Sequence, residues 1–130
     1  MVKDQISNLI IALKNASMTG KGVASVPATK MIISILEVLK KKNYIEKFEL
    51  SGDAPKKVVN VSIKYENGNP AIHDVKRVSK FSQRIYKGFK SIRPVKSGYG
   101  MLVITTPQGI LTDKESAYKK VGGEVLFQIW

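Results

Sequence analysis

A basic stretch without acidic residues, from Val75 to Thr112, carries the side chains best suited to bind a polyanion. Its cations are Lys76, Arg77, Lys80, Arg84, Lys87, Lys90, Arg93 and Lys96. Its interleaved aromatic residues are Phe81, Tyr86, Phe89 and Tyr99. Basic side chains bind phosphates, and aromatic rings offer faces on which bases or sugars stack. The pattern favours nucleic-acid binding over the alternative, a solvated Lys-rich surface above ordinary strands.

A polar hinge ends the basic stretch, with the sequence Thr105-Thr106-Pro107-Gln108-Gly109. Its hydroxyls and backbone groups are of the kind that can read base edges. The alternative is a tight turn before a capped helix, because Thr112 and Glu115 have capping-box spacing. We predict that the hinge contacts nucleic acid.

Residues for catalysis or metal binding are scarce. The chain has no cysteine and a single histidine, His73, so disulfides and thiolate sites are excluded and a zinc site is disfavoured. The acids are scattered, and neither a Gly-x-Ser-x-Gly motif nor a P-loop is present. We therefore expect no enzyme activity, no metal and no cofactor. A nucleic-acid chaperone without a specific site is a further alternative.

The net charge is +12 and the isoelectric point is near 9.9. Residues 1–65 and residues 66–130 each hold eleven basic and five acidic groups, so the excess is spread evenly. Such a charge indicates a polyanionic partner rather than a fold. A membrane surface would require an amphipathic basic helix or a lipid anchor, and neither is evident. The first residues lack a signal-peptide pattern, so we expect a cytoplasmic protein.

The first half of the sequence predicts two helices and three extended segments. The helices are expected at residues 4–17 and 28–42, and the strands at 23–26, 44–50 and 58–65. Asp4 is a plausible N-cap of the first helix, and Pro27 fits the first turn of the second. Three lysines end the second helix, where they either complement the helix dipole or contact phosphate.

The second half predicts a mostly β structure. Strands are expected at residues 71–78, 84–87, 101–105 and 124–130, and a short helix from the Thr112 cap to about Lys120. Phe127 and Trp130 are expected in the core. The breaker at 66–70 predicts two small subdomains, 1–66 and 71–130. Because strands and helices do not alternate regularly, the expected class is α+β.

Several motifs in order along the chain resemble those of one protein family. They are Val26-Pro27-Ala28-Thr29-Lys30, Arg77-Val78-Ser79-Lys80, Arg84-Ile85-Tyr86, Gly98-Tyr99-Gly100, the segment from Thr105 to Glu115, and Gly123-Glu124. The sequence resembles the eighth protein of the small ribosomal subunit, in its bacterial form. The resemblance implies a structural protein that binds the central domain of small-subunit ribosomal RNA, at an irregular stem with an internal loop, and is needed for subunit assembly.

The resemblance also implies partners and sites. Neighbouring small-subunit proteins are expected partners, the free protein is expected to be a monomer, and some members of the family repress translation by binding their own messenger RNA. The alternative is an RNA-binding or chaperone protein outside the ribosome. The expected RNA-binding residues are Lys30, Lys80, Arg84, Tyr86, Lys87, Thr105, Thr106, Pro107, Gly109, Gly123 and Glu124.

Two positions depart from the family pattern. Pro107 stands where the family has a third hinge residue, serine, so a hydroxyl and a backbone N–H are missing. Phe81-Ser82 stands where the family has Pro-Gly, which changes that turn. Glu124 is unusual in so basic a region. It is either a solvated strand end, or an acceptor for base amino groups, or a residue that orients Tyr86 or a lysine.

Overall fold

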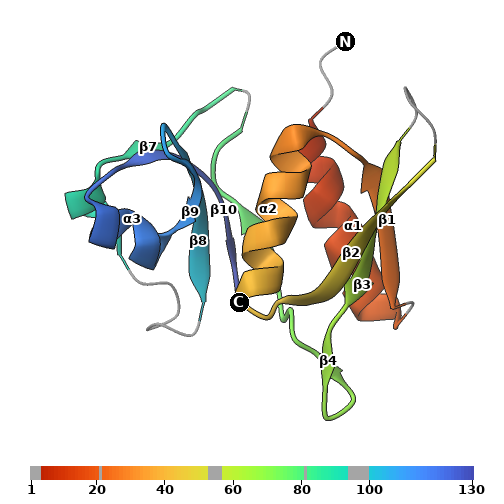
Figure 1. The fold of residues 1–130 in the computed structure, drawn as a ribbon. Helices are drawn as coiled ribbons and strands as arrows, with labels where there is room; N and C mark the ends of the chain where they lie inside the picture. The colour runs from red at the N-terminus through yellow and green to blue at the C-terminus, as the bar shows by residue number, and fades with distance from the viewer. Residues whose placement is uncertain (1–3, 21, 53–56, 81, 94–99) are drawn as a thin grey trace. The chain divides into compact units, whose positions relative to one another are not determined.

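The computed structural model describes residues 4–20, 22–52, 57–80, 82–93 and 100–130. The chain forms two compact units, Met1–His73 (unit 1) and Asp74–Trp130 (unit 2), each with its own antiparallel sheet (Figure 1). The expected α+β class is confirmed. Phe81 and Gly98-Tyr99, together with residues 53–56 of the turn between the second and third strands, lie outside the described residues.

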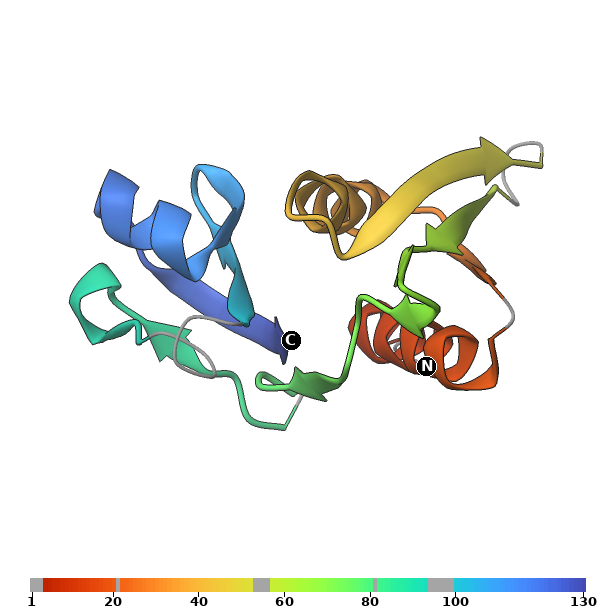
Figure 2. The same cartoon turned by 90° about the horizontal axis from the view of Figure 1, so that it is seen from below.

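Unit 1 consists of two helices on one face of a three-stranded sheet (Figures 1 and 2). Its elements are α1 (Gln5–Thr19), β1 (Val23–Pro27), α2 (Lys30–Lys41), β2 (Ile45–Ser51) and β3 (Val58–Ile63). The strand order is β1-β3-β2, so β3 is central. The apolar faces of the two helices and the alternating apolar residues of β3 are buried. These core residues are Ile6, Leu9, Ile10, Leu13, Ile32, Ile35, Leu36, Leu39, Val59, Val61 and Ile63.

Both helices of unit 1 begin at side-chain caps. The Asp4 carboxylate accepts a hydrogen bond from the Ser7 backbone N–H at 3.1 Å, as expected from the sequence. Helix α2 begins two residues later than expected, because the hydroxyl of Thr29 caps it by accepting from the Ile32 N–H. The placement of Pro27 in the first helical turn was wrong. Pro27 ends β1, with extended backbone before the cap.

The segment expected as a break, residues 66–70, forms a small hairpin. Strands β4 (Tyr65–Glu66) and β5 (Asn69–Pro70) pair across Asn67 and Gly68. Both loop residues have positive φ, at +53° and +82°, as in the two-residue turns that match strand twist. Unit 1 continues through this hairpin to His73.

Unit 2 is organised around its last strand. Its elements are β6 (Val75–Arg77), β7 (Tyr86–Lys87), the 3₁₀ helix η1 (Phe89–Ser91), β8 (Met101–Thr106), β9 (Gly109–Thr112), α3 (Asp113–Lys119) and β10 (Gly123–Ile129). Strand β10 pairs with β8 along one edge and with β6 and β7 along the other. Phe127 is fully buried, as expected, whereas Trp130 is half-buried against the cluster of Leu102, Ile104 and Val125.

Several predictions for unit 2 need correction. The expected strands at 71–78 and 84–87 are limited to β6 and β7, the residues that pair with β10 in a regular ladder. Strand β9 was not predicted, so the hinge is the turn of a β8–β9 hairpin rather than a direct link to the helix. The pairing register of β10 with β8 shifts between Val125 and Phe127, and Leu126 is buried. The strict alternation of buried and exposed side chains expected in this strand is therefore wrong.

Candidate nucleic-acid interface

Three neighbouring strands bring together residues that are far apart in the sequence. In β10, Glu124 pairs with Tyr86 of β7 on one side and with Thr105 of β8 on the other. Directly paired residues of antiparallel strands project from the same face of the sheet. Tyr86 is 69% exposed, Thr105 is half-buried and Glu124 is 9% exposed. We call these three residues the cross-strand row.

Two glycines make this close strand arrangement possible. A Cβ atom on Gly123 would overlap the carbonyl oxygen of Thr105 and lie 3.1 Å from the Cα of Thr106. A Cβ atom on Gly122 would overlap the Lys87 carbonyl oxygen and lie 2.7 Å from the Gly88 Cα. In both cases the added Cβ would meet backbone atoms, which cannot move aside as a flexible side chain can. The expected RNA-binding residue Gly123 therefore has a structural role in building the row, and its neighbour Gly122 was not predicted as a site residue.

An ion pair holds Arg84 beside the row. Its Nη1 lies 3.1 Å from Oε2 and 3.3 Å from Oε1 of Glu124. The Glu124 side chain is 11% exposed and that of Arg84 is 47% exposed, so the guanidinium covers the carboxylate while part of it faces solvent. Glu124 is therefore not a solvated strand end. It orients Arg84, rather than the Tyr86 or lysine considered from the sequence, and its charge is balanced there.

The buried hydroxyl of Ser79 closes the loop that carries Arg84. Ser79 Oγ donates to the Ile85 carbonyl at 3.2 Å and accepts from the Ile85 N–H at 2.8 Å. The same Ile85 carbonyl accepts from the Val125 N–H at 2.9 Å, which ties the loop to β10. Ser79 is 1% exposed. Its role was missed, although a small hydroxyl residue directly after apolar Val78 was a usable signal.

Ser79→Ala is expected to lower the free energy of unfolding by about 1–3 kcal/mol, because the part-buried Ile85 N–H loses its acceptor. Urea denaturation measures the loss, and hydrogen exchange at the Ile85 amide should become faster. The matched control is Ser82→Ala, since Ser82 is exposed in the same loop and should change little. Unchanged exchange at Ile85 would show that the Ser79 hydroxyl does not hold this loop.

The tip of the β8–β9 hairpin is exposed and internally bonded. Thr106 pairs with Gly109, its hydroxyl donates to the Gly109 carbonyl at 2.8 Å and accepts from the Gln108 N–H at 3.1 Å. Pro107, Gln108 and Gly109 are exposed, and Gly109 has φ of +108°, which favours glycine. The Thr105 hydroxyl makes no hydrogen bond to a described residue. It is therefore the hinge hydroxyl that remains available to a ligand.

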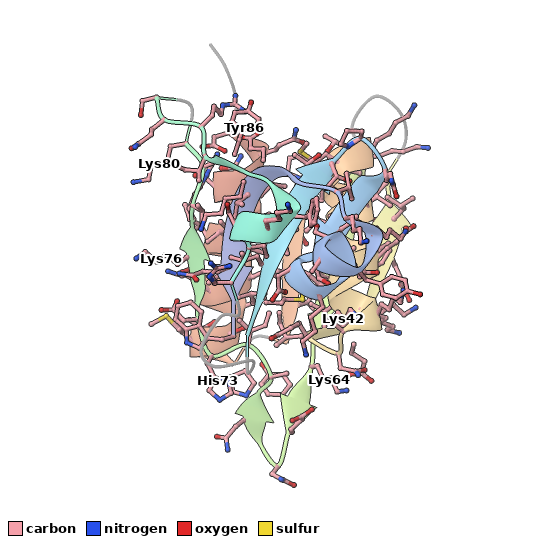
Figure 3. All side chains as sticks on the ribbon, turned by 90° about the vertical axis from the view of Figure 1, so that its left-hand side faces the viewer. Lys42, Lys64, His73, Lys76, Lys80 and Tyr86 are labelled. Carbon is pink, nitrogen blue, oxygen red and sulfur yellow. The ribbon has the colours of Figure 1, made fainter. Side chains whose placement is uncertain are left out.

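The three lysines expected to bind RNA lie in different elements. Lys80 is exposed at a tight turn, where its backbone N–H and carbonyl pair with those of Gln83 at 2.8 and 3.0 Å. Figure 3 shows Lys80 and Tyr86 toward one end of unit 2, with Lys76 farther along. Lys87 is half-buried, follows Tyr86 and pairs with Gly123. Lys30 is exposed as the first residue of α2, in unit 1.

The acids of unit 2 are engaged within the unit. Besides Glu124, Asp113 is buried and accepts from the Leu102 N–H, and Glu115 completes a capping box with Thr112. Asp74 accepts from the N–H of Val75 at 2.8 Å. Residues 74–130 hold eleven basic and four acidic groups. Unit 2 therefore carries a net positive charge, as phosphate binding requires.

In the described part of the chain, no helix is both long and apolar enough to cross a membrane. Within the same residues, no group of three or more His, Asp or Glu side chains is placed to hold a metal ion.

Comparison with known proteins identifies relatives along nearly the whole chain. The family model described as "Ribosomal protein S8" matches residues 4–130. A small ribosomal subunit protein uS8 from Nautilia profundicola is 43% identical over 131 residues, covering 100% of both chains. Proteins of the same name from Paracidovorax citrulli and Dictyoglomus thermophilum are 41% and 40% identical, covering 96% and 99% of this chain and 95% and 98% of their own. The chain belongs to the ribosomal protein S8 family, which confirms the resemblance seen in the sequence.

Proposed function

We propose that unit 2 binds structured RNA of the small ribosomal subunit through the cross-strand row, Arg84 and the tip of the β8–β9 hairpin. As a member of its family, the protein is a structural, non-enzymatic constituent of the small subunit, which in bacteria is part of the cytoplasmic ribosome. The observation that carries the proposal is the row itself. An exposed aromatic ring, a covered carboxylate and an available hydroxyl stand side by side on a cationic surface.

These groups suit an irregular stem better than a regular duplex. The exposed ring of Tyr86 can stack on a base that has left the helix, and the Thr105 hydroxyl can bond to a base edge or a 2′-hydroxyl. Arg84 and Lys80 supply cations for the flanking phosphates. We therefore propose the central domain of small-subunit RNA as the target, at an irregular stem with an internal loop, bound during subunit assembly.

The proposed function has further parts. A stem of similar shape in the protein's own messenger would compete for it, so repression of its own translation is proposed as well. Lys30 is proposed to contact phosphate in a second RNA region, and other small-subunit proteins are proposed neighbours. The free protein is proposed to be a monomer.

Chemical footprinting of the protein on complete small-subunit RNA tests the proposal. Protection should appear at an irregular stem of the central domain at moderate salt, and a scrambled competitor RNA should not remove it. If protection is absent, or is removed equally by any competitor, the protein is a non-specific binder instead. A salt titration separates the phosphate contribution, because counterion release is independent of sequence.

Thr105→Val is expected to weaken binding to the footprinted stem by about 1–2 kcal/mol, because an RNA polar group loses its partner while the β-branched shape is kept. Binding to unrelated duplex RNA and the melting temperature should stay near wild type. Dissociation constants on both RNAs measure this. The comparison variant is Thr106→Val, which should also lower the melting temperature, because the Thr106 hydroxyl bonds within the turn. Equal losses on both RNAs for Thr105→Val would contradict a reading role.

A further inference from the structure

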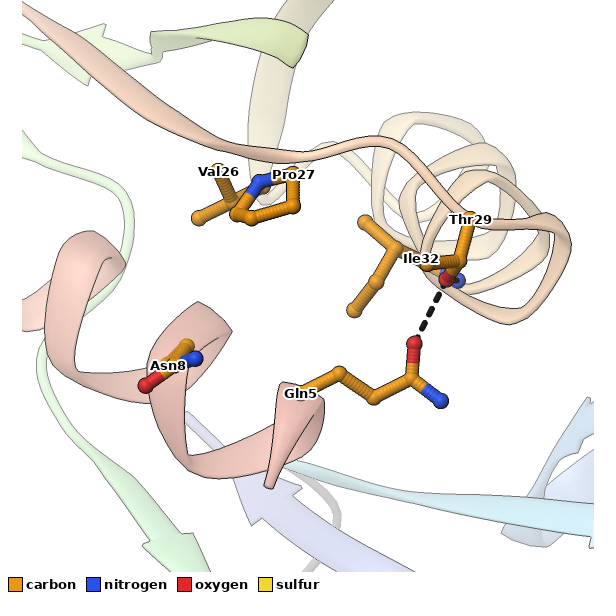
Figure 4. Close-up of a pocket in the computed structure, with 6 residues that line it drawn as sticks. All are labelled: Gln5, Asn8, Val26, Pro27, Thr29 and Ile32. Carbon is orange, nitrogen blue, oxygen red and sulfur yellow. Dashed lines mark hydrogen bonds between the residues drawn. The ribbon is translucent and has the colours of Figure 1, made fainter. Parts of the chain in front are cut away.

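A hollow of about 260 Å³ lies in unit 1, where the first turns of α1 and α2 approach the end of β1. Figure 4 shows its lining as two facing sides. The lining residues are Gln5, Asn8, Val26, Pro27, Thr29 and Ile32. The volume is below the range of about 300–1,000 Å³ typical of small-molecule sites, so the hollow suits one planar ring better than a metabolite.

One side of the hollow is apolar and the other carries amides. Val26 and Ile32 are buried, and Pro27 is exposed beside them, so β1 and α2 provide a smooth wall for a ring. On α1, Gln5 and Asn8 line the other side, and the Gln5 amide is turned toward Thr29 (Figure 4). Asparagine and glutamine amides pair with the hydrogen-bonding edge of adenine through one donor and one acceptor.

The Gln5 amide is held in place before any ligand arrives. Its Oε1 accepts a hydrogen bond from the Thr29 hydroxyl at 2.6 Å, the contact drawn in Figure 4. Its Nε2 lies 3.8 Å from the Met31 sulfur, which is a weak acceptor. Both ends of the Gln5 amide are therefore engaged within unit 1, which leaves the Asn8 amide to bond to a ligand in the hollow.

Charge near the hollow suits a nucleotide rather than a neutral side chain. Lys30 is exposed next to Thr29, and residues 1–73 hold eleven basic and six acidic groups. The nearest acid in the sequence, Asp4, is engaged, because its two carboxylate oxygens accept from the N–H and the hydroxyl of Ser7, both at 3.1 Å. A ring bound against Val26 and Pro27 would therefore have a cation available for its phosphate.

We propose that this hollow binds one unstacked nucleobase of small-subunit RNA, with adenine preferred. The inference rests on the proposed RNA-binding function, and it adds a base-reading site on unit 1 that is separate from the row on unit 2. Val26, Pro27 and Ile32 contact the ring, the Asn8 amide bonds to its edge, and Lys30, the exposed neighbour of Thr29, supplies a cation for its phosphate.

The test fills the hollow with a larger side chain. It then measures the protection of RNA adenines when the full-length protein binds complete small-subunit RNA. Asn8→Phe places a ring where the base would lie, and its control is Asn15→Phe, an exposed position two turns along the same helix. Probing with diethyl pyrocarbonate, which reacts at adenine N7, should show an adenine outside the central-domain stem that wild type and Asn15→Phe protect. Asn8→Phe should need about tenfold more protein for that protection, the scale of one amide–base pair. Asn8→Ala, which only removes the amide, should show a smaller loss in the same direction.

Protection of the central-domain stem and protection of the adenine test the two proposals separately. Protection of the central-domain stem should be equal in all four proteins, and its absence in wild type would count against the function proposed for unit 2. Equal adenine protection by Asn8→Phe and Asn15→Phe, with wild-type melting curves, would overturn the nucleobase site. An effect of Asn8→Phe that appears only when other small-subunit proteins are added would also overturn it, because the occupant would then be a protein side chain.

Discussion

Gly123→Ala is expected to lower the free energy of unfolding of unit 2 by roughly 3 kcal/mol, the upper range for overpacking against rigid surroundings. The added Cβ would overlap the Thr105 carbonyl oxygen and lie 2.9 Å from the Thr105 carbonyl carbon. Strand β8 would have to move away from β10, which would break the pairing of Glu124 with Thr105. Urea denaturation should show the loss, and binding to the footprinted stem should weaken with it, because the row is no longer assembled.

Gly88→Ala provides the control for Gly123→Ala. A Cβ on Gly88 would have no atom within 4 Å outside its chain neighbours, and its φ of −73° is ordinary for any residue. Gly88→Ala should therefore change stability by less than about 0.5 kcal/mol. Gly122→Ala should resemble Gly123→Ala, because its Cβ would meet the Gly88 backbone at 2.7 Å. If Gly123→Ala were as stable as Gly88→Ala, the close strand approach at Thr105 would be wrong.

Arg84→Ala should weaken binding to the same stem by about 2–3 kcal/mol, or roughly 30- to 150-fold. One cause is the loss of a cation at the RNA surface. The other is that Glu124 loses its partner, at 3.1 Å, so an uncovered carboxylate faces the phosphates. Adding Glu124→Gln to the Arg84→Ala protein should then recover about half of the lost binding free energy, because the repulsion is removed.

A double-mutant cycle, with binding measured on the footprinted stem, gives the coupling between Arg84 and Glu124. The four proteins are wild type, the two single variants and the double variant, each with a melting curve to exclude unfolding. Lys80→Ala provides the reference, since it removes an exposed cation and should weaken cognate and unrelated RNA alike. Additive effects of Arg84→Ala and Glu124→Gln would mean that Glu124 does not act through Arg84.

Local patterns in the sequence were sufficient for the elements with strong periodicity or capping signals. The apolar spacing of α1 and α2, the Asp4 cap and the Thr112 capping box depend on residues within a few positions of one another. The acid-free basic stretch likewise indicated a polyanionic partner without any knowledge of the fold. Family motifs pointed to Tyr86, Thr105 and Glu124 as separate candidates.

The tertiary structure decided how those candidates combine. Strand β9 was missed because its residues show no alternation of their own and extend only by pairing with β8. Glu124 could not be assigned from its neighbours in the sequence, since its partner Arg84 lies 40 positions away and meets it through the pairing of β7 with β10. The need for glycine at position 123 likewise comes from the backbone of β8. Contacts between distant strands, which no local pattern encodes, assemble the row and set the burial and charge of each of its members.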